Sequence, residues 1–339
     1  RQMCIRDRAM ARALDTAERV GIRLIVSCPE LKAEPEATVR RFMNHPATAG
    51  YFLRDEPSAD DFAELGAWAA RIRATDDAHY CYLNLFPNYA PCETLKTDSY
   101  REYVNRFDRE VPLQLLSFDH YPVVGDTCRP EWYENLEIFS DEARKAGKPF
   151  WAFALATAHE PYPIPDLAQL RLQVYSDLAY GAQGIQYFTY WTPEKNPTWD
   201  FHHAPVERSS GRRTDVYDKI KQMNAEIRAL SGVFLGCEVV SVRHTGESIP
   251  RGTVRLTELP DGVKKLETTG AGAVVSELRN GNNRFIVIVN RDFKNSMTLQ
   301  IELDETASRI LKDGSVVPAS IYHETMVVEP GDAMIYMFK

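Results

Sequence analysis

The sequence contains few cysteines, and none of them lies at a spacing that suits a metal site or a disulfide framework. Six occur among 339 residues, and no two form a CxxC pair: Cys4, Cys28, Cys81, Cys92, Cys128 and Cys237. Zinc sites and disulfide scaffolds are recognised by such spacings, so we expect neither here. The adjacent pair His202-His203 lacks carboxylates at a ligand spacing and indicates a metal only weakly. The sequence therefore implies no metal and no cofactor.

Long apolar runs and clusters of positive charge are absent as well. No run approaches the roughly eighteen apolar residues that a helix needs to span a bilayer, and the formal net charge is −8. These features argue against a membrane-spanning segment and against a nucleic-acid partner. No G-x-G-x-x-G follows a predicted strand, so the nucleotide site of a doubly wound sheet is not indicated.

The N-terminus of the chain has neither an initiator methionine nor a signal-like hydrophobic region. It begins Arg1-Gln2, and we expect a fragment whose first residues, with any targeting segment, are missing. The sequence itself therefore indicates neither a localisation nor an oligomeric state.

Up to about residue 235, apolar strands alternate with amphipathic helices. The predicted strands cover residues 22–27, 49–53, 80–86, 113–118, 149–155 and 184–190. The predicted helices cover residues 9–20, 36–43, 62–74, 100–107, 131–146, 167–180 and 217–230. Strands without polar alternation, each followed by a helix, are typical of a parallel sheet covered by helices. Six strands are two fewer than a closed (β/α)8 barrel has, so we expect a TIM-type barrel that lacks its first strands.

From about residue 236 the pattern changes to short β-rich runs separated by turns. The runs cover residues 239–242, 273–278, 284–290, 297–303, 308–311, 322–328 and 333–338. Turn signals such as Asn280-Gly-Asn-Asn283 lie between them. We therefore expect a (β/α)-barrel fragment over residues 1–235 and an antiparallel β-sandwich domain over residues 236–339.

Polar and aromatic side chains collect at the ends of the predicted strands. The stretch Tyr51-Phe-Leu-Arg-Asp-Glu-Pro57 ends a strand in two carboxylates, and the proline prevents the strand from continuing. Taken alone, Asp55-Glu56 is better explained as a solvated turn before a helix. In an α/β barrel, however, the carboxyl ends of the strands form the catalytic face. The other strand ends supply Asn84, Asp119, His120, Tyr121, His159, Glu160, Tyr190 and Trp191.

Hydrolysis of a glycosidic bond requires two carboxyl groups at the scissile bond, and aromatic rings suit a sugar ring. Asp55 and a partly apolar setting should raise the pKa of Glu56, which makes Glu56 the candidate general acid/base. Asp119 is the candidate for the second carboxylate, with a hydrogen-bonded turn as an equally good interpretation, and Glu160 is the reserve. Candidates for binding the sugar are Asp55, Asn84, His120, Tyr121, His159, Tyr190 and Trp191. Packing at the barrel rim is the alternative for the last two.

Three segments of the chain resemble clan A glycoside hydrolases, and more narrowly the β-galactosidase-like proteins of family 42. They are Gly50-Tyr-Phe-Leu-Arg-Asp-Glu-Pro57, Ser117-Phe-Asp-His-Tyr-Pro122 and the stretch from Leu172 to Trp191, of which the last is the most specific. The resemblance implies a (β/α)8 barrel that hydrolyses O-glycosidic bonds in oligo- or polysaccharides, with a carbohydrate as the binding partner and no cofactor. A periplasmic or secreted location is also consistent with the resembled family.

The resemblance also implies roles for individual residues. The acid/base glutamate of the family ends strand four, usually after asparagine; with the missing strands restored, Glu56 holds this position and Asp55 replaces the asparagine. The nucleophile of the family is a glutamate that ends strand seven, here residues 149–155, but no carboxylate stands there. Either Glu160 reaches back from the loop, or Asp119 serves instead, or water attacks with inversion. The remaining alternative is a non-catalytic carbohydrate-binding barrel that has lost its nucleophile.

Overall fold

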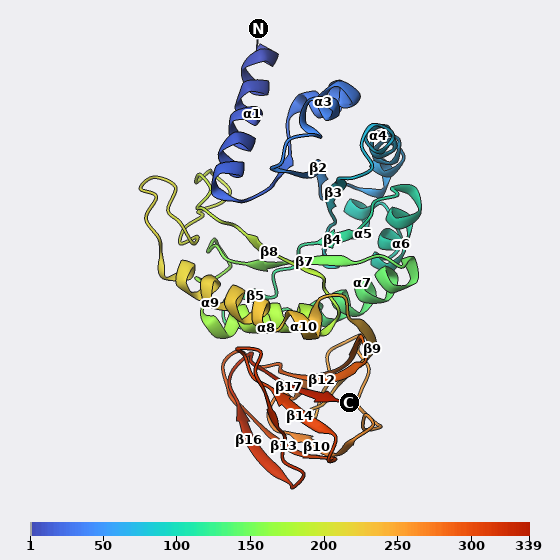
Figure 1. Cartoon of the computed structure of the whole chain (residues 1–339), viewed down its shortest axis with the longest axis vertical. Coiled ribbons are helices and arrows are strands. Elements are labelled where there is room, and N and C mark those ends of the chain that lie inside the picture. Colours follow the sequence, from blue (N-terminus) through green and yellow to red (C-terminus); the bar gives the residue numbers. More distant parts are fainter. Residues whose placement is uncertain (1) are drawn as a thin grey trace. The chain divides into compact units, whose positions relative to one another are not determined.

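The chain divides into two compact units in a computed structural model that describes residues 2–339, with side chains from Ala9 onward. One unit comprises the chain up to Asp119 together with Asp141–Phe150, and the other comprises His120–Ser140 and Trp151–Lys339. The chain passes between the units after Asp119, within helix α7 (Trp132–Ala146) and within strand β7 (Phe150–Leu155). Figure 1 labels many of the helices and strands of both units.

The first unit contains a parallel sheet whose strands lead to the candidate carboxylates. Strands β1 (Leu24–Val26), β2 (Thr48–Asp55) and β3 (Tyr80–Asn84) pair in parallel in that order. A parallel bridge between Leu85 and Phe118 continues this alignment to β4 (Leu116–Phe118). The helical segments are α1 (Gln2–Val20), α2 (Pro29–Ala33), α3 (Pro35–Phe42), η1 (Ala59–Asp61), α4 (Phe62–Thr75), α5 (Cys92–Leu95) and α6 (Tyr100–Glu110). The predicted alternation of strands and helices is confirmed in this unit.

Strand β2 lies against β3 in a register that small and buried residues fix. A Cβ atom added to Gly50 would lie 2.3 Å from the carbonyl oxygen of Tyr80, so only glycine allows this close approach. The next residue, Tyr51, is fully buried, and its hydroxyl donates to Asp76 Oδ2 at 2.5 Å. The resulting register pairs Asp55 with Asn84 at the carboxyl ends of the two strands.

The second unit begins with a smaller α/β part. Strand β7 pairs in parallel with β8 (Gly184–Phe188). Helix α8 (Leu167–Ala179) begins at a capping box in which Asp166 accepts from the Gln169 N–H at 2.7 Å. The other elements here are the hairpin β5 (Val123–Val124) and β6 (Thr127–Cys128), and the helices α9 (Asp215–Ala229) and α10 (Ser231–Phe234). The predicted helices over residues 167–180 and 217–230 are therefore confirmed.

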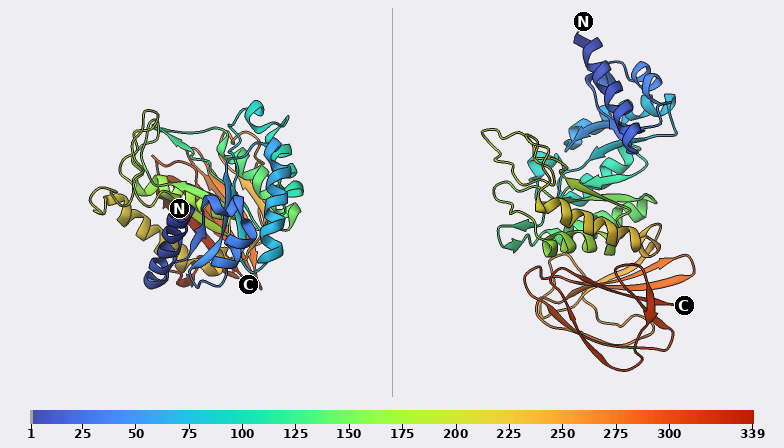
Figure 2. Two further views of the ribbon diagram at one scale, coloured as in Figure 1. Left: turned by 90° about the horizontal axis from the view of Figure 1, so that it is seen from above. Right: turned by 60° about the vertical axis from the view of Figure 1, so that its left-hand side comes forward.

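The rest of the second unit consists of two antiparallel sheets, drawn in orange and red in Figure 2. The six-stranded sheet has the order β15-β14-β17-β12-β11-β9, and the three-stranded sheet has the order β10-β13-β16. Apolar residues of both sheets, among them Ile286, Leu299 and Tyr336, form one buried cluster, as expected for a sandwich. The strands are β9 (Glu238–His244), β10 (Val263–Thr268), β11 (Ala273–Asn280), β12 (Asn283–Asn290), β13 (Met297–Leu303), β14 (Ala307–Ile310), β15 (Val316–Pro318), β16 (Glu324–Val328) and β17 (Ala333–Phe338).

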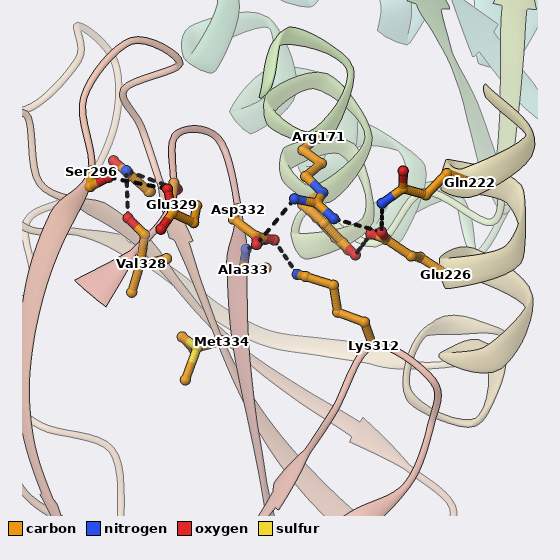
Figure 3. Close-up of polar contacts among 12 residues, drawn as sticks. Arg171, Gln222, Glu226, Ser296, Lys312, Val328, Glu329, Asp332, Ala333 and Met334 are labelled. Carbon is orange, nitrogen blue, oxygen red and sulfur yellow. Dashed lines mark hydrogen bonds and ion pairs between the residues drawn. The ribbon is translucent and has the colours of Figure 1, made fainter. Parts of the chain in front are cut away.

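A buried ion-pair network joins the β-sandwich to helices α8 and α9 within the second unit (Figure 3). Arg171 on α8 pairs with Glu226 on α9 at 2.6 Å and with Asp332, next to β17, at 3.5 Å. The Tyr175 hydroxyl donates to the second oxygen of Glu226 at 2.6 Å, and Lys312 pairs with Asp332. Because oppositely charged groups from three elements pair where water is largely excluded, removal of one partner would leave a charge without compensation.

Two further features of the described chain concern its helices and its cysteines. None of the helices in the described residues is long and apolar enough to cross a membrane. The side chains of Cys81, Cys92, Cys128 and Cys237 are thiols that form no disulfide. The side chain of Cys4 lies outside the described residues.

Candidate active site

Four of the candidate residues meet at the carboxyl ends of β2, β3 and β4 in the first unit. Asp55 ends β2 and Glu56 follows it directly, Asn84 ends β3, and Asp119 follows β4. The Asn84 amide donates to Asp119 Oδ1 at 2.7 Å and to Asp55 Oδ1 at 3.4 Å. Glu56 in turn forms a side-chain hydrogen bond with Asp119. Since parallel strands place their carboxyl ends at one edge of a sheet, residues far apart in the sequence converge here.

The backbone of Glu56 has an unusual conformation that its neighbours hold. Its φ angle is 44°, in the left-handed region that residues other than glycine rarely occupy. The Glu56 N–H donates to the Asn84 carbonyl at 2.9 Å, and the carbonyl of Pro57 accepts from the buried Tyr103 hydroxyl at 2.6 Å. Such a conformation costs on the order of 1–3 kcal/mol and is concentrated at functional sites. The backbone observation therefore singles out Glu56 independently of its charge.

The electrostatic setting of Glu56 favours its protonated form. Burial raises the pKa of its carboxyl to about 8, and the negative charges of Asp119 and Asp55 add to this effect. The O–H of a protonated Glu56 can donate a hydrogen bond to a carboxylate oxygen of Asp119, which accounts for the contact between the two carboxyl groups. The sequence-based prediction that Asp55 and a partly apolar setting raise the pKa of Glu56 is thus confirmed in direction. At neutral pH, Glu56 carries the proton that a general acid needs.

This raised pKa predicts a specific pH dependence of folding stability. Between pH 4.5, the ordinary pKa of a glutamate, and about pH 8, folded Glu56 holds a proton that the unfolded chain has released. The stability from this group is therefore complete below pH 4.5 and is lost as pH rises through about 8. Glu56→Gln should remove this dependence and be more stable than the wild type at pH 8, by about 1 to 3 kcal/mol for a half-buried group. Urea unfolding at several pH values measures the difference.

A matched control for that comparison is Glu64→Gln on α4. Glu64 is exposed and pairs with the exposed Lys32 at 2.9 Å, so its substitution should leave the slope of stability against pH as in the wild type. If the curves of wild type and Glu56→Gln ran parallel from pH 4.5 to 8, Glu56 would not hold a proton in this range.

Two buried residues that the sequence analysis missed support the amide of Asn84. Ser117 Oγ donates to Asn84 Oδ1 at 3.1 Å, and the Tyr82 hydroxyl lies 3.0 Å from Ser117 Oγ. A signal for both was present in the sequence. Side chains two residues apart on a strand share a face, and Ser117 precedes Asp119 by two positions just as Tyr82 precedes Asn84.

The second unit holds the remaining candidates, three of which are buried. Burial lowers the pKa of His120 to about 3, so its imidazole is neutral. The ring of Tyr121 is buried beside those of Tyr162 and Phe188. His159, also buried, has a pKa that burial lowers, and it lies among aromatic rings of Tyr162, Phe188, Trp199 and Phe201. A sugar-binding role for these three stays a prediction.

The other three candidates of the second unit are exposed. Tyr190 and Trp191 expose 65% and 49% of their surface, and their ring centroids lie 6.3 Å apart. Such an exposed aromatic pair suits stacking against a sugar ring. Glu160 is exposed on the loop after β7, where its backbone N–H donates to Asp200 Oδ1 at 2.9 Å. Among the side chains that the structure describes, no group of three His, Cys, Asp or Glu residues is placed to hold a metal ion.

Comparison with known structures finds similar chains among glycoside hydrolases. An α-amylase from Anoxybacillus is 12% identical with a TM-score of 0.49, and the match covers 91% of this chain and 63% of that one. An α-amylase from Geobacillus thermoleovorans is 10% identical with a TM-score of 0.49, covering 92% and 64%. A β-galactosidase from Marinomonas ef1 is 14% identical with a TM-score of 0.39, covering 51% and 27%. The chain thus spans less than two thirds of each of these chains.

Comparison with protein families gives a more specific result. No curated protein sequence matches the chain. Residues 79–230 match the model of the family Glyco_hydro_42, described as beta-galactosidase. This segment begins after Glu56 and includes Asn84, Asp119 and Glu160, as well as the aromatic pair Tyr190 and Trp191. The resemblance seen in the sequence is confirmed for residues 79–230, the segment that matches the glycoside hydrolase family 42 model.

Proposed function

We propose that this protein is a glycoside hydrolase with a carbohydrate substrate and that Glu56 is its proton donor. The observation that carries the proposal is a half-buried glutamate with a pKa raised to about 8, beside a second carboxylate. Departure of a sugar oxygen requires a proton, and a carboxyl group that remains protonated at neutral pH can supply it. The family match over residues 79–230 supports the same reaction class.

Asp119 is the second carboxylate in this proposal. Its side chain lies within hydrogen-bond reach of Glu56, whereas glycosidases hold their carboxyl pairs roughly 5–5.5 Å or 6.5–9.5 Å apart around a bound sugar. A sugar that enters between them would replace this bond, after which Asp119 faces the reacting carbon as a nucleophile or through a water molecule. Without a sugar, Asp119 helps to keep the proton on Glu56.

The proposal extends to the architecture around these residues. The parallel strands β1–β4 and β7–β8 would belong to a (β/α)8-type barrel over residues 1–235, and residues 236–339 would form the accessory β-sandwich domain. The exposed rings of Tyr190 and Trp191 support a sugar platform. The substrate in this proposal is an oligo- or polysaccharide, the class that the resemblance to family 42 implies.

Asp119→Asn tests the role of the second carboxylate. We expect the wild-type chain to hydrolyse at least one member of a panel of aryl glycosides and oligosaccharides, and Asp119→Asn to lose about 10²-fold or more in kcat/KM. Asp60→Asn, an exposed residue of η1, should retain wild-type activity. If Asp119→Asn kept the wild-type kcat/KM, Glu160 would be the candidate for the second carboxylate, and Glu160→Gln would test it. A folded wild-type chain that binds glycans but turns over none of them would contradict the proposal.

A further inference from the structure

Asn84 is a buried amide in contact with two of the three clustered carboxyl groups. Only 3% of its surface is exposed. Its Nδ2 donates to Asp119 Oδ1 at 2.7 Å and, at the longer distance of 3.4 Å, to Asp55 Oδ1. An ionised carboxylate accepts hydrogen bonds more strongly than a protonated one. The amide therefore stabilises the ionised form of Asp119 more than its protonated form.

Two hydroxyl groups fix the orientation of this amide through its oxygen atom. Asn84 Oδ1 accepts from Ser117 Oγ at 3.1 Å, and the Ser117 hydroxyl lies 3.0 Å from that of Tyr82. Because Ser117 Oγ gives its hydrogen to Asn84, the Tyr82 hydroxyl is the donor in the other contact. The donors thus run in one direction, from Tyr82 through Ser117 to Asn84 and on to Asp119. The side chains of Tyr82, Ser117 and Asn84 are all buried, so water does not compete for these hydrogen bonds.

We infer that Asn84, oriented by Ser117 and Tyr82, is a positioning residue that keeps Asp119 ionised and thereby leaves the shared proton on Glu56. This inference rests on the proposed function, since it assigns the acid and the base within the same site. With the amide turned the other way, its oxygen would face Asp119 and only a protonated Asp119 could bond to it. The proton would then be drawn away from Glu56, and the two carboxyl groups would exchange roles.

The Asn84 amide distinguishes the two carboxyl groups because it donates to Asp119. Besides Asp55 and Asp119, the Tyr103 hydroxyl of α6 also interacts with Glu56. The cation nearest to Glu56 in the sequence, Arg54, pairs with Asp61 at 3.0 Å. The charge of Asp55 opposes ionisation of both neighbours, whereas the short bond from Asn84 reaches Asp119.

Removal of the amide tests the inference without any need for activity. In the full chain with carbon-13-labelled carboxyl groups, Asn84→Leu should raise the titration midpoint of Asp119 by about one pH unit or more, because Asp119 loses a hydrogen bond to its ionised form. Ser117→Ala, which leaves Asn84 in place but frees its orientation, should raise this midpoint by a smaller amount. Asn105→Leu is the matched control, because Asn105 donates to Glu142 at 3.1 Å on the exposed side of α6; it should change nothing at Asp119.

The same variants have a second readout in the pH dependence of kcat/KM. The acidic limb of the profile, where Asp119 becomes protonated, should move to higher pH in Asn84→Leu by the same amount as the NMR midpoint. A loss of rate that is uniform over pH, or an unchanged Asp119 midpoint in a folded variant, would overturn the inference. If Asn84→Leu does not fold, the titration of Ser117→Ala decides in the same way. A shifted midpoint in a chain without hydrolase activity would uphold the proton placement and count only against the proposed function.

Discussion

Glu56→Gln should reduce kcat/KM for glycoside hydrolysis by about 10²-fold or more, while the affinity for the intact glycan changes little. The substitution preserves the size of the side chain and removes its transferable proton, and general acid catalysis contributes about 10²- to 10⁴-fold to such rates. In the wild type, the rate should fall as pH rises through about 8, because the acid form of Glu56 is lost there. The measurement is steady-state hydrolysis of an accepted aryl glycoside between pH 4 and 10.

The dependence on the leaving group distinguishes a proton donor from a residue that only binds sugar. A leaving group that departs as a stable anion needs little protonation, so the loss in Glu56→Gln should be smallest for dinitrophenyl glycosides and largest for alkyl glycosides. The alkaline limb of the pH profile should also disappear in the variant. An equal loss for all leaving groups, with the alkaline limb retained, would assign the proton donor to another residue.

Arg171→Met should lower the free energy of unfolding of the second unit by about 3–5 kcal/mol, the usual cost of removing one partner from a buried ion pair. Glu226 would keep its hydrogen bonds from Tyr175 and Gln222 but lose the cation 2.6 Å away, and Asp332 would keep Lys312 and the Ala333 N–H. Because Arg171 links α8 to α9 and to the β-sandwich (Figure 3), these elements should separate more readily. Denaturant unfolding followed by circular dichroism measures the change.

Two comparisons make the Arg171 result specific to the buried network. Arg212→Met removes an exposed pair with Glu207 at 2.9 Å and should cost less than about 1 kcal/mol. The double variant Arg171→Met, Glu226→Met should recover part of the loss, since it leaves no uncompensated charge at that pair. A single Arg171→Met variant as stable as Arg212→Met would show that the network does not hold these elements together.

The sequence predicted the regular elements well because local patterns determine them. Apolar strands such as residues 149–155 and amphipathic helices such as residues 217–230 lie close to β7 and α9. Strands β5, β6, β10 and β15 were missed. β10 contains two adjacent lysines, Lys264 and Lys265, and β15 has only three residues, one of them proline. In such short edge strands, pairing with a neighbour outweighs the weak preference of the residues themselves.

Part of the candidate site could also be predicted, because it follows from which residues stand at the ends of the strands. Asp55, Glu56 and Asp119 stand at strand ends, and a parallel sheet brings strand ends together. The direction of the Asn84 amide depends on Ser117 and Tyr82, which become neighbours only when β3 and β4 lie side by side. The left-handed backbone of Glu56 likewise depends on contacts from Asn84 and Tyr103. The spacing of two residues places Tyr82 and Ser117 on the strand faces of Asn84 and Asp119, but it gives neither the direction of the amide nor the backbone conformation of Glu56.

The central claim is that Glu56 holds a proton at neutral pH, and direct titration of its carboxyl group tests this claim. In the wild-type chain with carbon-13-labelled glutamate, the signal that disappears in Glu56→Gln identifies this carboxyl. We predict a midpoint close to pH 8, because burial and the charges of Asp119 and Asp55 oppose ionisation. A midpoint near 4.5, the ordinary value for glutamate, would contradict the account, because Glu56 would then have no proton to donate.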